Sequence, residues 1–343
     1  MKEMQKNQKA SEFAIGNRRY IGGKSLLIPS IRDAIPPHIP RGTFCDIFAG
    51  TGVVGASVQE DFECVVFNDF LFSNYAVYQG FFGKGQFSIS KLKDFQIEMV
   101  NQISKPLKRN YFSKNYSESY FSSSAATSIG HIRDAIERNE FKLNRREQAI
   151  ALASLIYSAD RIANTVGHYE AFRKNVAGFK NFEYRLIAAK TNTKSKIYRR
   201  DANELSREIK SDVVYIDPPY NSRQYSRFYH VLETLTKWDS PQLSGVALKP
   251  PTENVSEYCK SRAVTAFADL VENLDTKLVI VSYNNTYESK STSSQNKISI
   301  EEIKRILKSK GPTKIKKIPH KHFSAGNTDF KNHLEYLFVT EVR

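Results

Sequence analysis

The segment that most constrains the fold is a short apolar run that ends in an acid and two prolines. Residues 213–216 (VVYI) are all apolar, which is typical of a strand buried on both faces of a sheet. Asp217, Pro218 and Pro219 follow directly. Proline lacks an N–H donor and cannot continue a central strand, so the chain has to turn after the carboxylate. The sequence therefore predicts an acid at the carboxyl end of a buried strand, where α/β sheets place their ligands.

Other apolar runs alternate with helical patterns along the chain. The strand-like runs are residues 43–48, 64–67, 197–201, 277–283 and 334–340. The helical stretches are residues 53–60, 225–238, 264–274 and 300–309. Strands that alternate with helices predict a doubly wound α/β sheet.

A different pattern occupies residues 83–193, between the second and third of these strands. Helical periodicity is strong over 148–163 and present over 129–139, whereas the Ser-, Tyr- and Phe-rich stretch 113–128 predicts a loop. We therefore expect a largely helical insertion. The polar residues before position 18 predict a flexible or loosely docked N-terminal arm over 1–17 rather than a signal peptide.

Composition narrows the class of protein. No apolar run approaches the ~20 residues that a membrane span needs, so no membrane contact is expected. Cys45, Cys64 and Cys259 are too scattered for a disulfide framework or a metal site, which fits a reducing cytoplasm and predicts no bound metal. His320 and His322 flank Lys321 without a nearby acid or thiol, and phosphate contact or solvation is expected there rather than metal ligation.

The charge balance indicates a polyanionic partner. The chain holds 51 Lys and Arg against 36 Asp and Glu, a net charge of +15. Residues 173–200 contain nine basic residues with interleaved aromatic side chains and one acid, and residues 303–322 contain eight basic residues and no acid. This distribution favours a folded basic surface over a merely basic soluble protein.

A glycine turn links the first strand to the first helix. The sequence Phe48-Ala49-Gly50-Thr51-Gly52 allows close approach of the backbone to a ligand, and Asp69, 17 residues after Gly52, ends the next strand where an acid binds ribose hydroxyls. A structural turn would also contain two such glycines. A second segment, Gly22-Gly23-Lys24-Ser25, resembles the end of a phosphate-binding P-loop, but position 18 is arginine where that motif needs glycine, so we reject this interpretation.

The segment Asp217-Pro218-Pro219-Tyr220 offers a carboxylate, a backbone carbonyl and a flat aromatic ring. An exocyclic amine can be held by two hydrogen-bond acceptors, together with an aromatic ring that stacks on its base. The alternative is a strand closed by a rigid turn with no chemical role.

Three motifs in one order resemble the Dam-like class of adenine-specific DNA methyltransferases: residues 19–24 (RYIGGK), 48–52 (FAGTG) and 217–220 (DPPY). Residues 160–165 (DRIANT) and 221–226 (NSRQYS) are similar to adenine methyltransferases of type IIS restriction systems. The resemblance covers about 18–75 and 145–340 and is weak over 83–144. The class often has Trp where this chain has Tyr20.

The resemblance implies a Rossmann-like seven-stranded sheet, mostly parallel with one antiparallel strand, built from 18–82 and 194–343, with 83–193 recognising DNA. It implies S-adenosyl-L-methionine as cofactor, bound by Tyr20, Gly22, Gly23, Lys24, Asp46, Phe48, Ala49, Gly50, Thr51, Gly52, Asp69 and Asp201. It implies direct methyl transfer to a flipped adenine at Asp217, Pro218, Pro219 and Tyr220. With the charge pattern, it predicts DNA contacts at Arg173, Lys174, Lys180, Arg223 and Tyr225.

The expected partner is double-stranded DNA, in a bacterial cytoplasm with the nucleoid, for a monomer or weak dimer. A cognate restriction endonuclease acting independently is a possible second partner. Alternatives remain open at this point: methylation of cytosine N4 or of an RNA amine, and a catalytically silent nucleic-acid-binding module. His168 fits a surface or capping role better than a catalytic one.

Overall fold

The computed structural model describes residues 12–174, 178–191, 194–219, 221–285, 296–319 and 334–343. The chain divides into two compact units. The helical unit comprises Met1–Gly23, Leu71–Ile197 and Ser226–Thr252. The sheet unit comprises Lys24–Phe70, Tyr198–Tyr225 and Glu253–Arg343. Each unit is therefore assembled from three separate parts of the sequence.

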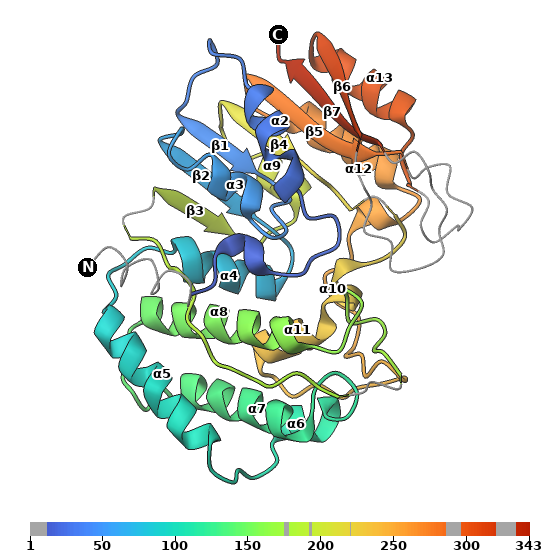
Figure 1. Ribbon diagram of the computed structural model, residues 1–343. Coiled ribbons are helices and arrows are strands. Elements are labelled where there is room, and N and C mark those ends of the chain that lie inside the picture. The colour runs from blue at the N-terminus through green and yellow to red at the C-terminus, as the bar shows by residue number, and fades with distance from the viewer. Residues whose placement is uncertain (1–11, 175–177, 192–193, 220, 286–295, 320–333) are drawn as a thin grey trace. The chain divides into compact units, whose positions relative to one another are not determined.

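Seven strands form one sheet in the order β3-β2-β1-β4-β5-β7-β6 (Figure 1). The strands are β1 (Thr43–Asp46), β2 (Cys64–Asn68), β3 (Ser195–Tyr198), β4 (Val213–Ile216), β5 (Leu278–Asn284), β6 (Thr313–Pro319) and β7 (Leu334–Glu341). β1 pairs in parallel with β2 and β4, and β4 with β5, whereas β7 is antiparallel to both β5 and β6. The predicted seven-stranded, mostly parallel sheet is confirmed.

The strand order reverses between β1 and β4. From β1 the sheet continues to β2 and β3 on one side and to β4 and β5 on the other. In open parallel sheets, ligands bind outside the carboxyl ends of the strands at such a reversal. Asp46 is the last residue of β1 and Asp217 follows β4, so two acids lie at this point of the fold.

Apolar strand residues form the core of the sheet unit with three helices. α9 (Ala202–Ser206), α12 (Ala263–Asn273) and α13 (Ile300–Lys310) contribute to one buried cluster with β1, β4 and β5. Val214, Val279 and Phe267 are completely buried in it. The remaining elements of this unit are short: η2 (Ser25–Leu27), α2 (Ile28–Asp33), α3 (Val53–Ser57) and η3 (Glu257–Cys259). The apolar runs are thus the interior of the sheet.

The helical unit contains η1 (Ile15–Asn17), α4 (Phe72–Phe82), α5 (Ile89–Ile103), α6 (Tyr111–Tyr116), α7 (Ser123–Arg138), α8 (Arg145–Ile162) and α11 (His230–Lys237). α4 packs against α8. A β-carbon at Gly80 would lie 2.3 Å from the Ala153 β-carbon, so this close helix pair requires glycine. The expected helices of the insertion are confirmed, and α4 and α5 were not predicted.

The loop predicted for residues 113–128 is wrong. α6 covers its start and α7 its end, with a short link between them. Ser122 is the N-cap of α7, where its hydroxyl accepts the N–H of Ala125 at 3.2 Å. Phe112 and Tyr116 are completely buried. Serines that were interpreted as loop residues act as caps, and aromatic rather than aliphatic side chains supply the core.

Two further elements differ from the prediction: one helix is divided, and one strand was not predicted. The helix predicted over 225–238 is two helices, α10 (Tyr225–Phe228) and α11, because Tyr229 leaves helical geometry between them. β6 was not predicted, since four of its seven residues are exposed and three of those are lysines. It lies at the edge of the sheet, where lysines are commonly found.

The described part of the predicted N-terminal arm is docked. Phe13 is 2% exposed and forms a bridge with Ile187. The Tyr157 hydroxyl donates to the carbonyl of Ile15 at 2.7 Å. Residues 1–11 lie outside the described residues.

Candidate active site

An ion pair joins the catalytic acid predicted from sequence to the lysine of the glycine-glycine-lysine motif. Lys24 Nζ lies 3.0 Å from Asp217 Oδ2, and the two side chains are 5% and 16% exposed. Burial raises the pKa of Asp217 to about 7, and Lys24 opposes that rise. Burial alone would lower the pKa of Lys24, but the carboxylates of Asp217 and Glu335 raise it above its ordinary value. Lys24 is therefore charged and favours the ionised form of Asp217.

Asp46 is a second buried acid at the same edge of the sheet. It is 1% exposed, and its Oδ2 accepts the N–H of Gly55 at 3.0 Å. Its Oδ1 has no hydrogen-bond partner among the described residues. Burial raises the pKa of Asp46 to about 8, and the charges of Asp217 and Asp69 add to the rise. A cation placed beside Asp46 would remove this cost and ionise the group.

The glycine turn after β1 has the backbone conformation that the sequence predicts. Gly50 and Gly52 have φ of 54° and 79°, in the left-handed region. The N–H of Gly50 donates to Asp69 Oδ2 at 2.9 Å, which holds the acid after β2 against the turn. Ala49 and Thr51, the two neighbours of Gly50 in the chain, are buried.

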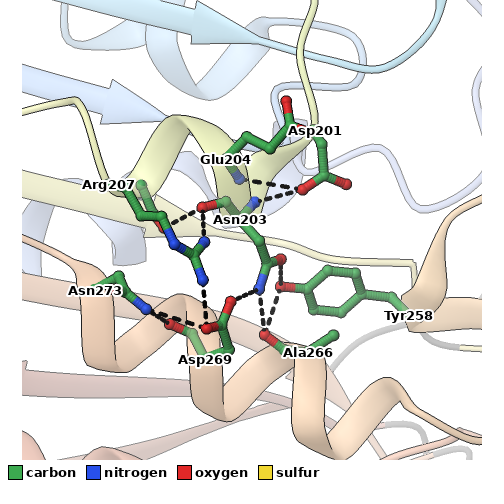
Figure 2. A network of polar contacts seen from close by, with 9 residues as sticks. Asp201, Asn203, Glu204, Arg207, Tyr258, Ala266, Asp269 and Asn273 are labelled. Carbon is green, nitrogen blue, oxygen red and sulfur yellow. Dashed lines mark hydrogen bonds and ion pairs between the residues drawn. The ribbon is translucent and has the colours of Figure 1, made fainter.

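A polar network fixes the segment that contains Asp201. Asp201 is the N-cap of α9, and its Oδ1 accepts the N–H groups of Asn203 (2.9 Å) and Glu204 (3.2 Å) (Figure 2). Both of these cap bonds use Oδ1, and Oδ2 takes no part in the cap. Asp201 was expected to end a strand, but β3 stops at Tyr198.

The same network reaches the aromatic residue of the glycine turn. The Tyr258 hydroxyl donates to Asn203 Oδ1 at 2.8 Å, and the Asn203 amide donates to Asp269 at 2.7 Å (Figure 2). The ring of Tyr258 meets the ring of Phe48 edge-on, with 5.0 Å between centroids. Asn203, Tyr258 and Asp269 were not predicted from sequence. Of these three residues, only Asn203 lies close in sequence to a predicted site residue, two positions after Asp201.

The segment after Asp217 is held at both ends. Pro218 is buried and Pro219 half-buried, whereas Tyr220 lies outside the described residues. Gln224 exchanges two hydrogen bonds with the backbone of Ser256, at 2.8 and 3.1 Å. Arg223 and Tyr225, which we predicted to contact DNA, flank this anchor and are half-buried.

Tyr20, Gly22 and Gly23 belong to the helical unit. The rings of Tyr20 and Tyr229 stack, with 4.5 Å between centroids and 3° between planes. The Tyr229 hydroxyl accepts the N–H of Ile21 at 2.8 Å. Gly22 has φ of 78°, which explains glycine at that position.

The motif at 160–165 braces a loop in the helical unit. Asp160 accepts the backbone N–H of Arg19 at 3.0 Å and the Tyr169 hydroxyl at 2.9 Å. Asn164 donates to the carbonyl of Arg173 at 3.0 Å, and Thr165 forms a bridge with Phe172. The motif was recognised from sequence, but its bracing role was not.

The predicted DNA-contact residues of the insertion are on the surface of the helical unit. Arg173, Lys174 and Lys180 are all exposed. His168 precedes them. Its Nδ1 accepts the N–H of Glu170 at 3.2 Å, and its ring stacks on Phe228 with 4.9 Å between centroids. His320 and His322 lie outside the described residues.

Neither a metal-binding cluster nor a membrane-spanning helix is present among the described residues. No group of three or more His, Cys, Asp or Glu side chains there is arranged to hold a metal ion. None of the helices described is both long and apolar enough to cross a membrane.

The fold and site define a Rossmann-like α/β protein with an acidic site at the strand reversal and a glycine turn beside it. Comparison with known families identifies the family to which the chain belongs. The chain belongs to the D12 class N6 adenine-specific DNA methyltransferase family, whose model matches residues 20–321. The resemblance predicted from the three motifs is therefore confirmed.

Individual relatives agree with this assignment. The chain is 34% identical over 346 residues to modification methylase StsI of Streptococcus sanguinis. It is 32% identical over 348 residues to type II methyltransferase M.FokI of Planomicrobium okeanokoites. Both matches cover 94% of this chain and 52% of the relative, so the chain spans about half the length of these two proteins. A match to M.NlaIII of Neisseria lactamica, 29% identical over 341 residues, covers 94% and 98%.

Proposed function

We propose that this chain methylates the N6 amine of adenine in double-stranded DNA, with S-adenosyl-L-methionine as methyl donor. The observation that carries the proposal is Asp217: a buried carboxylate after β4, paired with Lys24, in a chain that belongs to an adenine-specific DNA methyltransferase family. The cofactor supplies a methyl group that its sulfonium has already activated. The chain has to hold the amine in line with that group, so positioning supplies most of the rate.

The acidic site suits a cofactor that carries a sulfonium and an ammonium group. Asp46 Oδ1, which has no hydrogen-bond partner among the described residues, is a buried acceptor that a cation would satisfy. Asp69, held by Gly50, would accept the ribose hydroxyls, and Asp201 Oδ2 would accept the amine of the cofactor's adenine. Tyr20, Phe48 and the glycines of both motifs complete the proposed set.

In the proposed mechanism, the target adenine leaves the duplex at a cost of a few kcal/mol. Asp217 and the Pro218 carbonyl accept hydrogen bonds from its N6 amine, which leaves more electron density on nitrogen. Tyr220, outside the described residues, is proposed from sequence to stack on the base, a contact worth about 1–3 kcal/mol. Lys24 keeps Asp217 in the accepting, ionised form.

The test is methyl transfer by an Asp217→Ala variant. We expect the rate to fall at least about a hundredfold, because an acceptor that acts in the transition state is lost. Asp275→Ala is the matched control, since Asp275 is an exposed acid paired with Lys210 in the same unit. Near-parental transfer by a folded Asp217→Ala variant would contradict the assignment.

The competing functions are separated by their products. Mass spectrometry of digested DNA distinguishes N6-methyladenine from N4-methylcytosine, and tritium transfer to DNA against ribosomal RNA distinguishes the polymers. Calorimetric binding of S-adenosylmethionine excludes a silent nucleic-acid-binding module. Methylation of adenine in DNA is supported by the description of the family and by three relatives that are named as methylases or methyltransferases.

For target recognition, we propose the braced loop at 165–172 and the exposed cations that follow it. Arg173→Glu with Lys174→Glu should weaken DNA binding and flatten its dependence on salt, because phosphate contacts release counterions. An unchanged salt slope would contradict a phosphate contact at these two positions.

We also propose that the chain protects host DNA in a restriction-modification system, in a bacterial cytoplasm with the nucleoid, as a monomer or weak dimer. The modification methylase and type II methyltransferase names of its relatives support this role. Sequencing genomic DNA from an expressing host, with detection of modified bases, tests it and gives the recognition site. A restriction endonuclease that acts independently would be blocked at the modified sites.

A further inference from the structure

Five lysines of the sheet unit lie on the edge strand β6 and on α13, which packs against β6 and β7, and are here called the edge strip. Side chains alternate along a strand, so Lys314 and Lys316 lie on one face of β6 and Lys317 on the other. Lys304 and Lys308 lie on α13, and Lys314, Lys316 and Lys317 lie on β6. All five are exposed. Lys304 and Lys308 are four residues apart and therefore share one face of the helix.

The five lysines of the edge strip have no carboxylate partner within the described ranges, whereas several other cations of this unit are paired. Ion pairs join Lys210 to Asp275 at 3.1 Å and Lys260 to Glu257 at 2.7 Å. No ion pair within the described ranges joins any lysine of the edge strip to an acid. Its charge is therefore available to an anionic partner.

Strand register places the edge strip relative to the proposed catalytic acid. β6 runs in the same direction as β4 and β5, because β7 is antiparallel to both of its neighbours. The register aligns one residue from each of four strands: Ile216, Val281, Phe338 and Ile315. Lys316 is therefore level with Asp217. Three strand spacings separate the two, which is about 14 Å along the sheet.

This separation suits the backbone of a duplex whose target base lies at Asp217. Each DNA strand carries a phosphate every ~3.4 Å of helix axis, so about 14 Å corresponds to roughly four base pairs from the target. We propose that the edge strip binds the phosphate backbone of the DNA substrate, several base pairs from the methylated adenine. The inference rests on the proposed function and adds a contact surface to it.

Protection of the sheet edge is the competing explanation. Lysines on an edge strand prevent pairing with a second copy of the strand. That role involves only Lys314, Lys316 and Lys317 and does not extend to Lys304 and Lys308, which lie on a helix. Phosphate binding accounts for both elements.

The experiment measures DNA affinity across a series of salt concentrations by fluorescence anisotropy, using the full chain and duplex DNA of mixed sequence. One variant combines Lys314→Gln, Lys316→Gln and Lys317→Gln. A second variant on the other element combines Lys304→Gln and Lys308→Gln. The matched control combines Lys210→Gln and Lys260→Gln, which removes paired cations of the same unit.

We expect the slope of log affinity against log salt to become shallower by about 3 for the strand variant and about 2 for the helix variant. The control should keep the parental slope, and all variants should bind S-adenosylmethionine like the parent chain. Parental slopes in both strip variants would overturn the proposal. So would new self-association by light scattering with an unchanged slope, which would assign the lysines to edge protection.

Failure of the proposed function gives a different result. A parent chain that binds DNA with a steep salt slope but adds no methyl group would refute the methyltransferase proposal and leave the edge strip supported by its shallower slopes. A parent chain that methylates DNA while its strip variants bind like the parent would refute the edge strip alone.

Discussion

Replacing Lys24 with methionine removes the charge beside Asp217 and keeps a side chain of similar length. The two charged atoms are 3.0 Å apart, and neither side chain is more than 16% exposed. At an effective dielectric constant of ~20, unit charges at that distance attract by about 5 kcal/mol. This energy corresponds to about four pKa units, and water that enters the space reduces the effect, so we expect a rise of about two or more in the pKa of Asp217.

The direction of the pH effect follows from the role of Asp217. The proposed reaction needs the ionised carboxylate, which accepts a hydrogen bond from the amine, so the rate rises with pH as Asp217 loses its proton. Its pKa is about 7 with Lys24 present. Without Lys24 the carboxyl group stays protonated through neutral pH, and the rise in rate should move above about pH 9.

Single-turnover methyl transfer between about pH 5 and pH 10, at saturating cofactor, checks this expectation. Lys24→Arg, which keeps the charge, should restore a midpoint near the parental one. Lys210→Met is the matched control, because Lys210 pairs with Asp275 at the surface and is 87% exposed. A Lys24→Met variant with the parental midpoint would refute the reasoning, since Lys24 would then have no hold on the ionisation of Asp217.

Three other variants test neighbouring parts of the structure. Burial raises the pKa of Asp46 from 3.8 to about 8, so the folded protein holds this proton more tightly than the unfolded chain does. The resulting stability is complete below 3.8, falls as pH rises between the two pKa values and is lost above about 8. Asp46→Asn should therefore flatten the fall in melting temperature of the cofactor-free protein between about pH 4 and pH 8, and an unaltered fall would count against this role of Asp46. Asp201→Asn keeps an oxygen that can cap α9 but replaces the acceptor Oδ2 with an N–H donor. The KM for S-adenosylmethionine should therefore rise about tenfold while the melting temperature stays unchanged. A KM equal to that of the parent chain would show that Asp201 only caps the helix. Tyr229→Phe removes the acceptor for the N–H of Ile21 and should lower the free energy of unfolding by about 1 kcal/mol in urea titrations, whereas no change would indicate that water replaces the hydroxyl.

Much of the sheet could be predicted from local patterns. β4 has the predicted bounds, and β1, β2, β5 and β7 lie within two residues of theirs, because strands covered on both faces must be apolar throughout. β6 could not be found this way. β6 has a neighbouring strand on one side only, so it does not need a continuous apolar sequence. Its lysine-rich sequence could equally belong to a loop or a charged helix.

Helix boundaries depended more on contacts between distant segments. A periodic pattern covers 225–238, yet the helix breaks at Tyr229, whose hydroxyl and ring bind the segment around Tyr20 and Ile21. Local periodicity carries no information about such a partner. The same holds for α6, whose Phe112 and Tyr116 are completely buried and whose Tyr116 hydroxyl donates to Thr234 on α11.

For the candidate site, local sequence patterns specify which groups are present: an acid before two prolines, a glycine turn, and acids at the ends of successive strands. These follow from local rules, because apolar runs end where the chain leaves the sheet and glycine is required where φ is positive. The pairing of these groups is a property of the folded chain. The fold places Lys24 against Asp217, leaves Asp46 Oδ1 without a hydrogen bond from any described residue, and commits one oxygen of Asp201 to the end of a helix. Charges and hydrogen bonds act through space over a few ångströms, so their partners depend on which segments the fold brings together.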